Sequence, residues 1–483
     1  MSAIPDEDED MDAEDTTPTS ATTDDRKPSR LPSLPNITAV SSTTESTASH
    51  QRPHRPQTAR SNSKHSIKFS LQQHARWSAL PKDVKKYLSY HKDNLSYHHY
   101  AFKYDGSDFL KSTFLEIALN DQSHALVYAI VAFSCYHYVI AEENSTVSLE
   151  TFLQYYNRSI ILLGQSIKKK KPSIPTLLTI LQLATIEVWS PLLAFNRVRL
   201  THFKEFLRDW ANLLGHERAA YQILTELFTP QTITQDETRR KIAAWYMRFD
   251  LFAGIMSGGQ TKLSREWVAA CQEHYRRQSR DRPDDLPARL EDFFSSARLL
   301  VTDSTLLFAA KKKETISDDE FAGKTRDTIQ QYADFGHTID TAFPDPSNFV
   351  KDLPKARSPD RDDLSNAGSP HFLYNQDLFT MNYILLDFWA MDLNFKHQLA
   401  VAQEQTTTIE MESIALKTCK MIEAIHRSGL GQKGAMLGCQ ASLGIASLFL
   451  PKDKENVDWC RGKFAQIEQL GYVGISFAPI SSD

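Results

Sequence analysis

Closely spaced cysteines are absent from this chain, which excludes a locally encoded zinc site. The sequence has 483 residues and five cysteines, none of them in a Cys-x-x-Cys pair: Cys135, Cys271, Cys419, Cys439 and Cys460. Zinc modules need ligands a few residues apart, and disulfide frameworks usually need an even set of cysteines. We therefore expect reduced, buried thiols, and no metal or cofactor bound by this chain.

Long apolar runs are absent as well. None approaches the roughly 18 to 20 residues that span a bilayer, and the first 30 residues are acidic and polar, unlike a secretory leader. We expect no contact with a membrane and a location in the cytosol or nucleus.

The leader, residues 1–74, has few apolar side chains and a segregated charge. Residues 1–25 carry ten acidic side chains and no Lys or Arg, whereas residues 26–76 carry nine Lys or Arg and only Glu45 as an acid. Such a segment buries too little surface to offset the entropy of ordering its backbone. We predict a disordered, solvated leader; an acidic activation segment and weak contact of its basic half with phosphates are the functional alternatives.

Alternating strand patterns are missing, and helical spacing of apolar residues takes over after the leader. This pattern predicts an all-α fold. Leu126–Ile140 is apolar almost all round, so it should lie in the middle of a core, and Ser107 and Asp108 are expected to cap a helix that begins at Phe109. Further helices are predicted over 149–167, 174–188, 205–229, 236–256, 264–277, 287–310, 316–343, 372–397, 408–428, 432–449 and 454–470.

The domain organisation follows from one proline-rich stretch. Residues 344–371 contain five prolines and many charges, which predicts a surface linker or loop. It would separate a helical domain over 75–343 from C-terminal helices over 372–483. We expect those helices to pack on the same body, with a small second body as the alternative.

The sequence contains fragments of enzyme motifs, but none of them is complete. The acidic pairs Asp284–Asp285, Asp318–Asp319 and Asp362–Asp363 lie beside a proline, at a helix start and in the linker, whereas a metal-diphosphate site needs aspartates that face a core. SGGQTK, after Met256, lacks the Gly-Lys-Ser/Thr of a phosphate loop, and the histidines around His91, His98, His99 and His137 lack metal-ligand spacing. We predict that the protein is not an enzyme.

The segment WYMRFDLFAG places Arg248 and Asp250 inside an otherwise apolar helix that also contains Trp245 and Tyr246. Because an unpaired buried charge is costly, we expect these charges to pair with each other or with neighbouring helices. A polar patch that lines an effector pocket is the functional alternative.

A run of lysines, Lys168, Lys169, Lys170 and Lys171, precedes Pro172. Its composition matches a short nuclear-import signal. Lysines at the negative end of a helix dipole explain it equally well.

Several stretches together resemble a known family. They are NLLGHERAAYQILTELFTP from Asn212, DETRRKIAAWYMRFDLFAGIMSGG from Asp236 and, more loosely, SYHHYAFKYDGSDFLKSTFLEIAL, ALVYAIVAFSCYHY, FLQYYNRSIILL and TLLTILQLATIE. The chain is similar over about Tyr90–Phe343 to the regulatory domain of fungal zinc-cluster transcription factors. The resemblance implies a nuclear regulator of RNA polymerase II transcription, a helical body that binds an effector or dimerises with itself or a relative, and Trp245, Tyr246, Arg248 and Asp250 as a family marker.

Members of this family normally carry six cysteines that hold two zinc ions and contact DNA. Because such a module folds only around its metal, none can form within residues 1–74. We expect this chain to reach DNA only through a DNA-binding partner or the transcription machinery, with zinc expected only if a cluster is encoded upstream. A terpenoid-synthase-like enzyme of metal-diphosphate type and a helical scaffold protein are the alternatives.

One stretch departs from the family pattern. Residues Val188–Lys204 (VWSPLLAFNRVRLTHFK) separate segments that follow each other almost directly in related domains. A lineage-specific loop or the translation of a retained intron would explain them. Sequencing the spliced transcript distinguishes the two.

Overall fold

The computed structural model describes residues 70–95, 99, 102, 104–141, 149–169, 171–189, 202–257, 261–351, 373–405, 408–430 and 435–469. These residues form helices, and their only strand-like pairing is an isolated bridge between Phe349 and Tyr374. The all-α prediction is confirmed. The leader up to residue 69, and residues 190–201 of the unusual stretch, lie outside the described residues.

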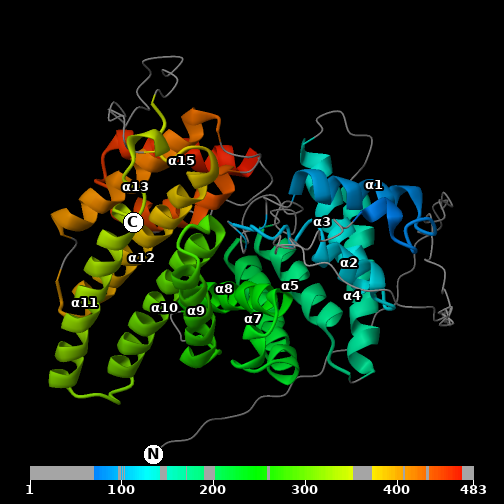
Figure 1. The fold of residues 1–483 in the computed structure, drawn as a ribbon, viewed down its shortest axis with the longest axis horizontal. Helices are drawn as coiled ribbons and strands as arrows, with labels where there is room; N and C mark the ends of the chain where they lie inside the picture. Colours follow the sequence, from blue (N-terminus) through cyan, green and yellow to red (C-terminus); the bar gives the residue numbers. More distant parts are fainter. Residues whose placement is uncertain are drawn as a thin grey trace, which may run out of the picture. The chain divides into compact units, whose positions relative to one another are not determined.

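The N-terminal helices gather around α3 (Ala125–Ala141), whose side chains are buried without a break from Ala125 to His137. This burial confirms the central position expected from its apolar sequence. Figure 1 shows α2 and α4 beside α3, which also contacts α1 and α5. The bounds of these helices are α1 Lys82–Tyr90, α2 Thr113–Asn120, α4 Leu149–Lys168, α5 Ile174–Trp189 and α7 His202–Leu227, with short turns of η1 Leu71–Gln73 and η2 His91–Leu95.

The middle helices connect this group to the C-terminal one. Helix α8 (Glu237–Ser257) contacts α5 and α7, whereas α10 (Leu286–Lys312) packs against α9 (Arg265–Asp281), α11 (Asp318–Asp340) and α12 (Phe379–Ala402). The short turns here are η3 Thr232–Thr234 and η4 Pro346–Asn348.

The C-terminal helices share one hydrophobic core with α10 and α11. Leu290, Leu300, Tyr332 and Ile339 are buried in the same cluster as residues of α12 and the helices that follow it. Helix α12 lies beside α13 (Ile409–Ser428), as Figure 1 shows, and both contact α14. The remaining elements are η5 Gln376–Leu378, η6 Ala435–Cys439, α14 Gln440–Ser447 and α15 Lys454–Gln469.

Two helix starts differ from the predictions because of local caps. Asp105, not Ser107 or Asp108, accepts hydrogen bonds from the backbone N–H groups of Phe109 (3.0 Å) and Leu110 (2.9 Å), and α2 begins only at Thr113. The helix predicted from residue 372 starts at Phe379. There the Asn382 side chain bonds both backbone groups of Tyr374 and holds the preceding turn in place.

The helix predicted over 432–449 divides into η6 and α14. All five cysteines are buried and none forms a disulfide. Across the described helices, none is long and apolar enough to cross a membrane. The boundaries at 343 and 371 stay predictions.

Candidate functional site

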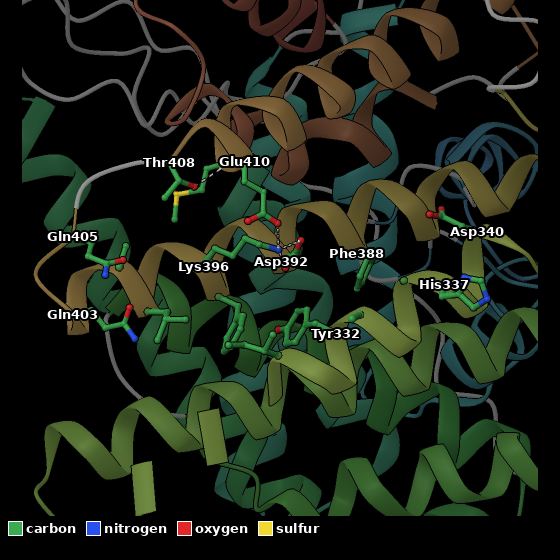
Figure 2. A pocket seen from close by; sticks show the side chains of 17 residues that line it. Tyr332, His337, Asp340, Phe388, Asp392, Lys396, Gln403, Gln405, Thr408 and Glu410 are labelled. Atoms are coloured by element: carbon green, nitrogen blue, oxygen red, sulfur yellow. Dashed lines mark hydrogen bonds and ion pairs between the residues drawn. The ribbon is translucent and has the colours of Figure 1, made fainter. Parts of the chain in front are cut away.

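A cavity of about 530 Å³ lies between α11, α12 and the start of α13. Figure 2 shows Phe388, Asp392 and Lys396 along α12, with Tyr332 of α11 on one side of them and Glu410 of α13 on the other. The volume falls in the range of about 300 to 1,000 Å³ that is usual for small-molecule sites. Its size therefore makes it a candidate ligand site.

The apolar part of the cavity is built from aromatic rings of two helices. Tyr332 of α11 stacks on Phe395 of α12 with ring centroids 4.7 Å apart, and its hydroxyl lies 3.2 Å from the Ser304 hydroxyl of α10. Gly336 brings the helices together, because a Cβ there would lie only 3.0 Å from the Phe388 ring. A small residue and stacked rings thus fix this wall.

The polar part centres on Lys396. Its ammonium lies 2.6 Å from Asp392 on the same helix and 3.2 Å from Glu410 on α13. Burial raises the pKa of Asp392, and the hydrogen bond and charge of Lys396 oppose that rise. Asp392 is mostly buried, whereas the Glu410 side chain is 67% exposed, so only Glu410 is open to solvent.

The two ends of the cavity differ in their polar groups. Gln403 and Gln405 lie at one end and His337 and Asp340 at the other (Figure 2). The lining thus holds three carboxylates and one lysine. Its net charge is negative.

Little in the sequence indicates this cavity. Its residues belong to α11, α12 and α13 and look like ordinary amphipathic positions, and none of them was singled out in the sequence. Ile329 on α11, at 47% exposure, marks an uncovered apolar surface at the cavity.

The residues of the predicted family marker lie on α8, away from the cavity. The two aromatic side chains and the two charged side chains of the marker have different surroundings. Trp245 is fully buried against the rings of His99, Phe102 and Phe114, with centroids 5.2, 5.5 and 5.6 Å away. Tyr246 is also fully buried. Both therefore contribute to the N-terminal core.

The charges of the motif bind different partners. The Arg248 guanidinium pairs with Asp387 of α12 at 3.0 Å. Asp250 instead accepts hydrogen bonds from the backbone N–H groups of Lys262 (2.7 Å) and Leu263 (2.9 Å), just before α9. The contacts described here therefore serve structure, and the alternative of an effector pocket at this motif stays a prediction.

A second carboxylate lies near Asp250. Glu217 of α7 is almost fully buried and pairs with the Lys262 ammonium at 3.2 Å. Burial is the first cause that raises the pKa of Asp250, to about 7; the two backbone hydrogen bonds lower it, and the charge of Glu217 raises it further. This buried acidic pair was not found from the sequence, because its members are 33 residues apart (250 − 217).

The lysine run lies at the end of α4. Lys168, Lys169 and Lys171 are exposed there, and Lys170 lies outside the described residues. Exposure fits both a charged helix end and an import signal.

The remaining candidate motifs occupy structural positions. Asp285 caps α10, while Asp318 and Asp319 open α11 at the surface; Asp362 and Asp363 lie outside the described residues. Buried His91 and His99 lie 3.4 Å apart through their Nε2 atoms, and His137 packs on the Phe133 ring. Within the described ranges, no three His, Cys, Asp or Glu side chains gather as metal ligands would.

Comparison with known proteins gives the family. The model of the fungal specific transcription factor domain matches residues 86–383, well over half of the chain. The chain belongs to this family, which is regulatory, and the resemblance stated from its sequence is confirmed. No curated protein and no solved structure matches it significantly.

Proposed function

We propose that this protein regulates RNA polymerase II transcription in the nucleus, through contacts that its helical body makes with other proteins. The match to the fungal specific transcription factor domain carries the proposal, because it runs from α1 to the first turn of α12 and so covers the N-terminal and middle helices. The helices described above are closely packed and joined by ion pairs, which suits a rigid surface that binds other proteins.

The route to DNA is the second part of the proposal. The five cysteines are buried at separate positions of the helical body, so that body supplies no zinc cluster. A DNA-bound partner, a relative of this chain or the transcription machinery would bring the protein to promoters. A dimer, with a second copy or with a relative, is one form of that association.

A tethering experiment tests the regulatory function. The full chain is fused to a bacterial repressor's DNA-binding domain and directed to a reporter promoter, with the DNA-binding domain alone as the control. We expect reporter output to rise or fall relative to the control. Unchanged output, with the fusion protein present at normal level, contradicts the proposal.

Nuclear import through the lysine run is tested separately. Replacing Lys168, Lys169, Lys170 and Lys171 by alanine should move a fluorescently tagged chain out of the nucleus. Replacing Lys311–Lys313, a similar run at the end of α10, is the matched control and should leave the distribution unchanged. A tagged wild-type chain that is excluded from the nucleus counts against the nuclear proposal itself.

A further inference from the structure

We propose that the cavity between α11, α12 and α13 binds small organic cations, with an aromatic or aliphatic body on the apolar wall and a protonated amine at the carboxylates. A regulatory role for the bound cation rests on the proposed function. The binding of cations by the cavity does not depend on that function.

The space, which is partly open to solvent, suits a small molecule. Tyr332, Phe388, Phe395 and Met411 line it and are each at least nine-tenths buried, so the wall is part of the core and already formed. A preformed apolar wall lowers the cost of ordering the site when a ligand binds. A volume of about 530 Å³ accommodates a molecule of metabolite size.

The charges decide which head group fits. Lys396 is already bound by two carboxylates, Asp392 and Glu410, and Asp340 adds a third negative group to the lining. An anionic ligand would have to displace a carboxylate from Lys396 while facing the others. A cation meets an excess of negative charge, so the lining favours it.

Glu410 is the residue best placed to meet the ligand amine. Its side chain is 67% exposed and lies 3.2 Å from Lys396, whereas Asp392 is buried and makes two bonds to the same lysine, at 2.7 and 2.6 Å. Glu410 can therefore turn toward a ligand while Asp392 keeps Lys396 neutralised. We assign Glu410 as the specificity-determining residue.

Three probes that share one ring system test this assignment: naphthylmethylammonium, naphthylmethanol and naphthoate. Equilibrium dialysis against the purified full-length protein gives each dissociation constant. We expect the ammonium to bind most tightly and the naphthoate most weakly, with at least about a fivefold difference between them, as one unscreened charge pair would give. Failure of all three probes to bind, or naphthoate binding as tightly as the ammonium, overturns the proposal.

Two variants locate the binding. Ala333 lines the cavity from the exposed face of α11, so Ala333→Trp should fill it and abolish binding of naphthylmethylammonium. Ala322→Trp is the matched control, because Ala322 is also exposed on α11 but lies outside the cavity lining. Equal thermal melting of the two variants verifies folding, and unchanged ammonium binding by Ala333→Trp overturns the location.

Glu410→Gln tests the charge assignment while keeping the side-chain size. It should weaken the ammonium and leave naphthylmethanol unchanged, and an unaltered ratio between these probes contradicts the role of Glu410. These measurements use no reporter gene. Probe binding without reporter activity would therefore refute the transcriptional function alone, and reporter activity without probe binding would refute the ligand site alone.

Discussion

Replacing Asp250 by asparagine should change how the stability of this protein depends on pH. Asp250 is 1% exposed and lies near the buried carboxylate Glu217. Burial first, and Glu217 in addition, raise its pKa to about 7 from an ordinary value of 3.8, although hydrogen bonds from Leu263 and Lys262 oppose the rise. Asparagine has nearly the same shape and does not titrate in this range.

The sign follows from proton uptake. Between about pH 4 and pH 7 the folded protein holds a proton at Asp250 that the unfolded chain has released, so the free energy of unfolding falls as pH rises. The contribution is fully present below the ordinary pKa and is lost as pH rises through the raised one. With pKa values of 3.8 and about 7, the loss between pH 5 and pH 8 amounts to about 2.6 kcal/mol.

Asparagine adds a constant penalty. Its amide keeps one acceptor oxygen, so one of the two backbone N–H groups, of Lys262 or Leu263, loses its partner at a cost of about 1 to 3 kcal/mol at every pH. Because neutral Asp250 resembles asparagine, the full penalty shows only below the ordinary pKa, and by pH 5 the wild type has already lost about 1.6 kcal/mol of that advantage. The two proteins should therefore be similarly stable near pH 5, and the variant should gain up to about 2.6 kcal/mol relative to the wild type between pH 5 and pH 8.

Urea unfolding of both proteins, followed by circular dichroism at several values between about pH 5 and pH 8, measures this difference. Contributions of groups that do not interact with Asp250 cancel in it. Glu116→Gln, at an exposed position of α2, serves as the control and should differ from the wild type by the same amount throughout. An Asp250→Asn variant whose stability relative to the wild type stays constant or falls as pH rises would refute the reasoning.

Three further substitutions probe the packing. Trp245→Ala should lower the free energy of unfolding by about 3 to 5 kcal/mol, because the side chain is fully buried; denaturant titration measures it, and a loss below about 1 kcal/mol would contradict the packing. Arg248→Met and Asp387→Asn should show a coupling of about 1 to 3 kcal/mol in a double-mutant cycle, given their 3.0 Å contact between helices, and additive effects would contradict the pair. Lys463→Met should cost about 3 to 5 kcal/mol, because it leaves buried Glu423 without its ammonium partner, and adding Glu423→Gln, which keeps an acceptor for the Trp459 indole N–H (3.0 Å), should restore stability in thermal unfolding; an equally unstable double variant would argue against the ion pair.

The sequence predicted a helix correctly where the pattern that indicates it lies within that same short segment. The apolar stretch that forms α3 is buried from Ala125 to His137, and the helix predicted over 149–167 is α4. Both depend on residues within a few turns of each other, which one sequence displays directly. The fold class and most helix positions could therefore be derived.

Long-range partners could not be derived in this way. Arg248 was expected to pair, but its partner Asp387 lies 139 positions away, and nothing in either segment indicates the other. The candidate cavity is the same kind of case. It exists because α11 and α12 leave part of their facing surfaces uncovered beside Phe388 and Lys396, and that depends on how helices from distant parts of the chain meet.

The shared core of α10 to α15 has a consequence for protein production. A fragment that ended after α11 would leave Leu290, Tyr332 and Ile339 open to water and Arg248 without Asp387. Exposed apolar patches of this kind promote aggregation. Protein produced for crystallisation or binding work should therefore extend through Gln469, the last residue of α15, even though the family match ends at residue 383.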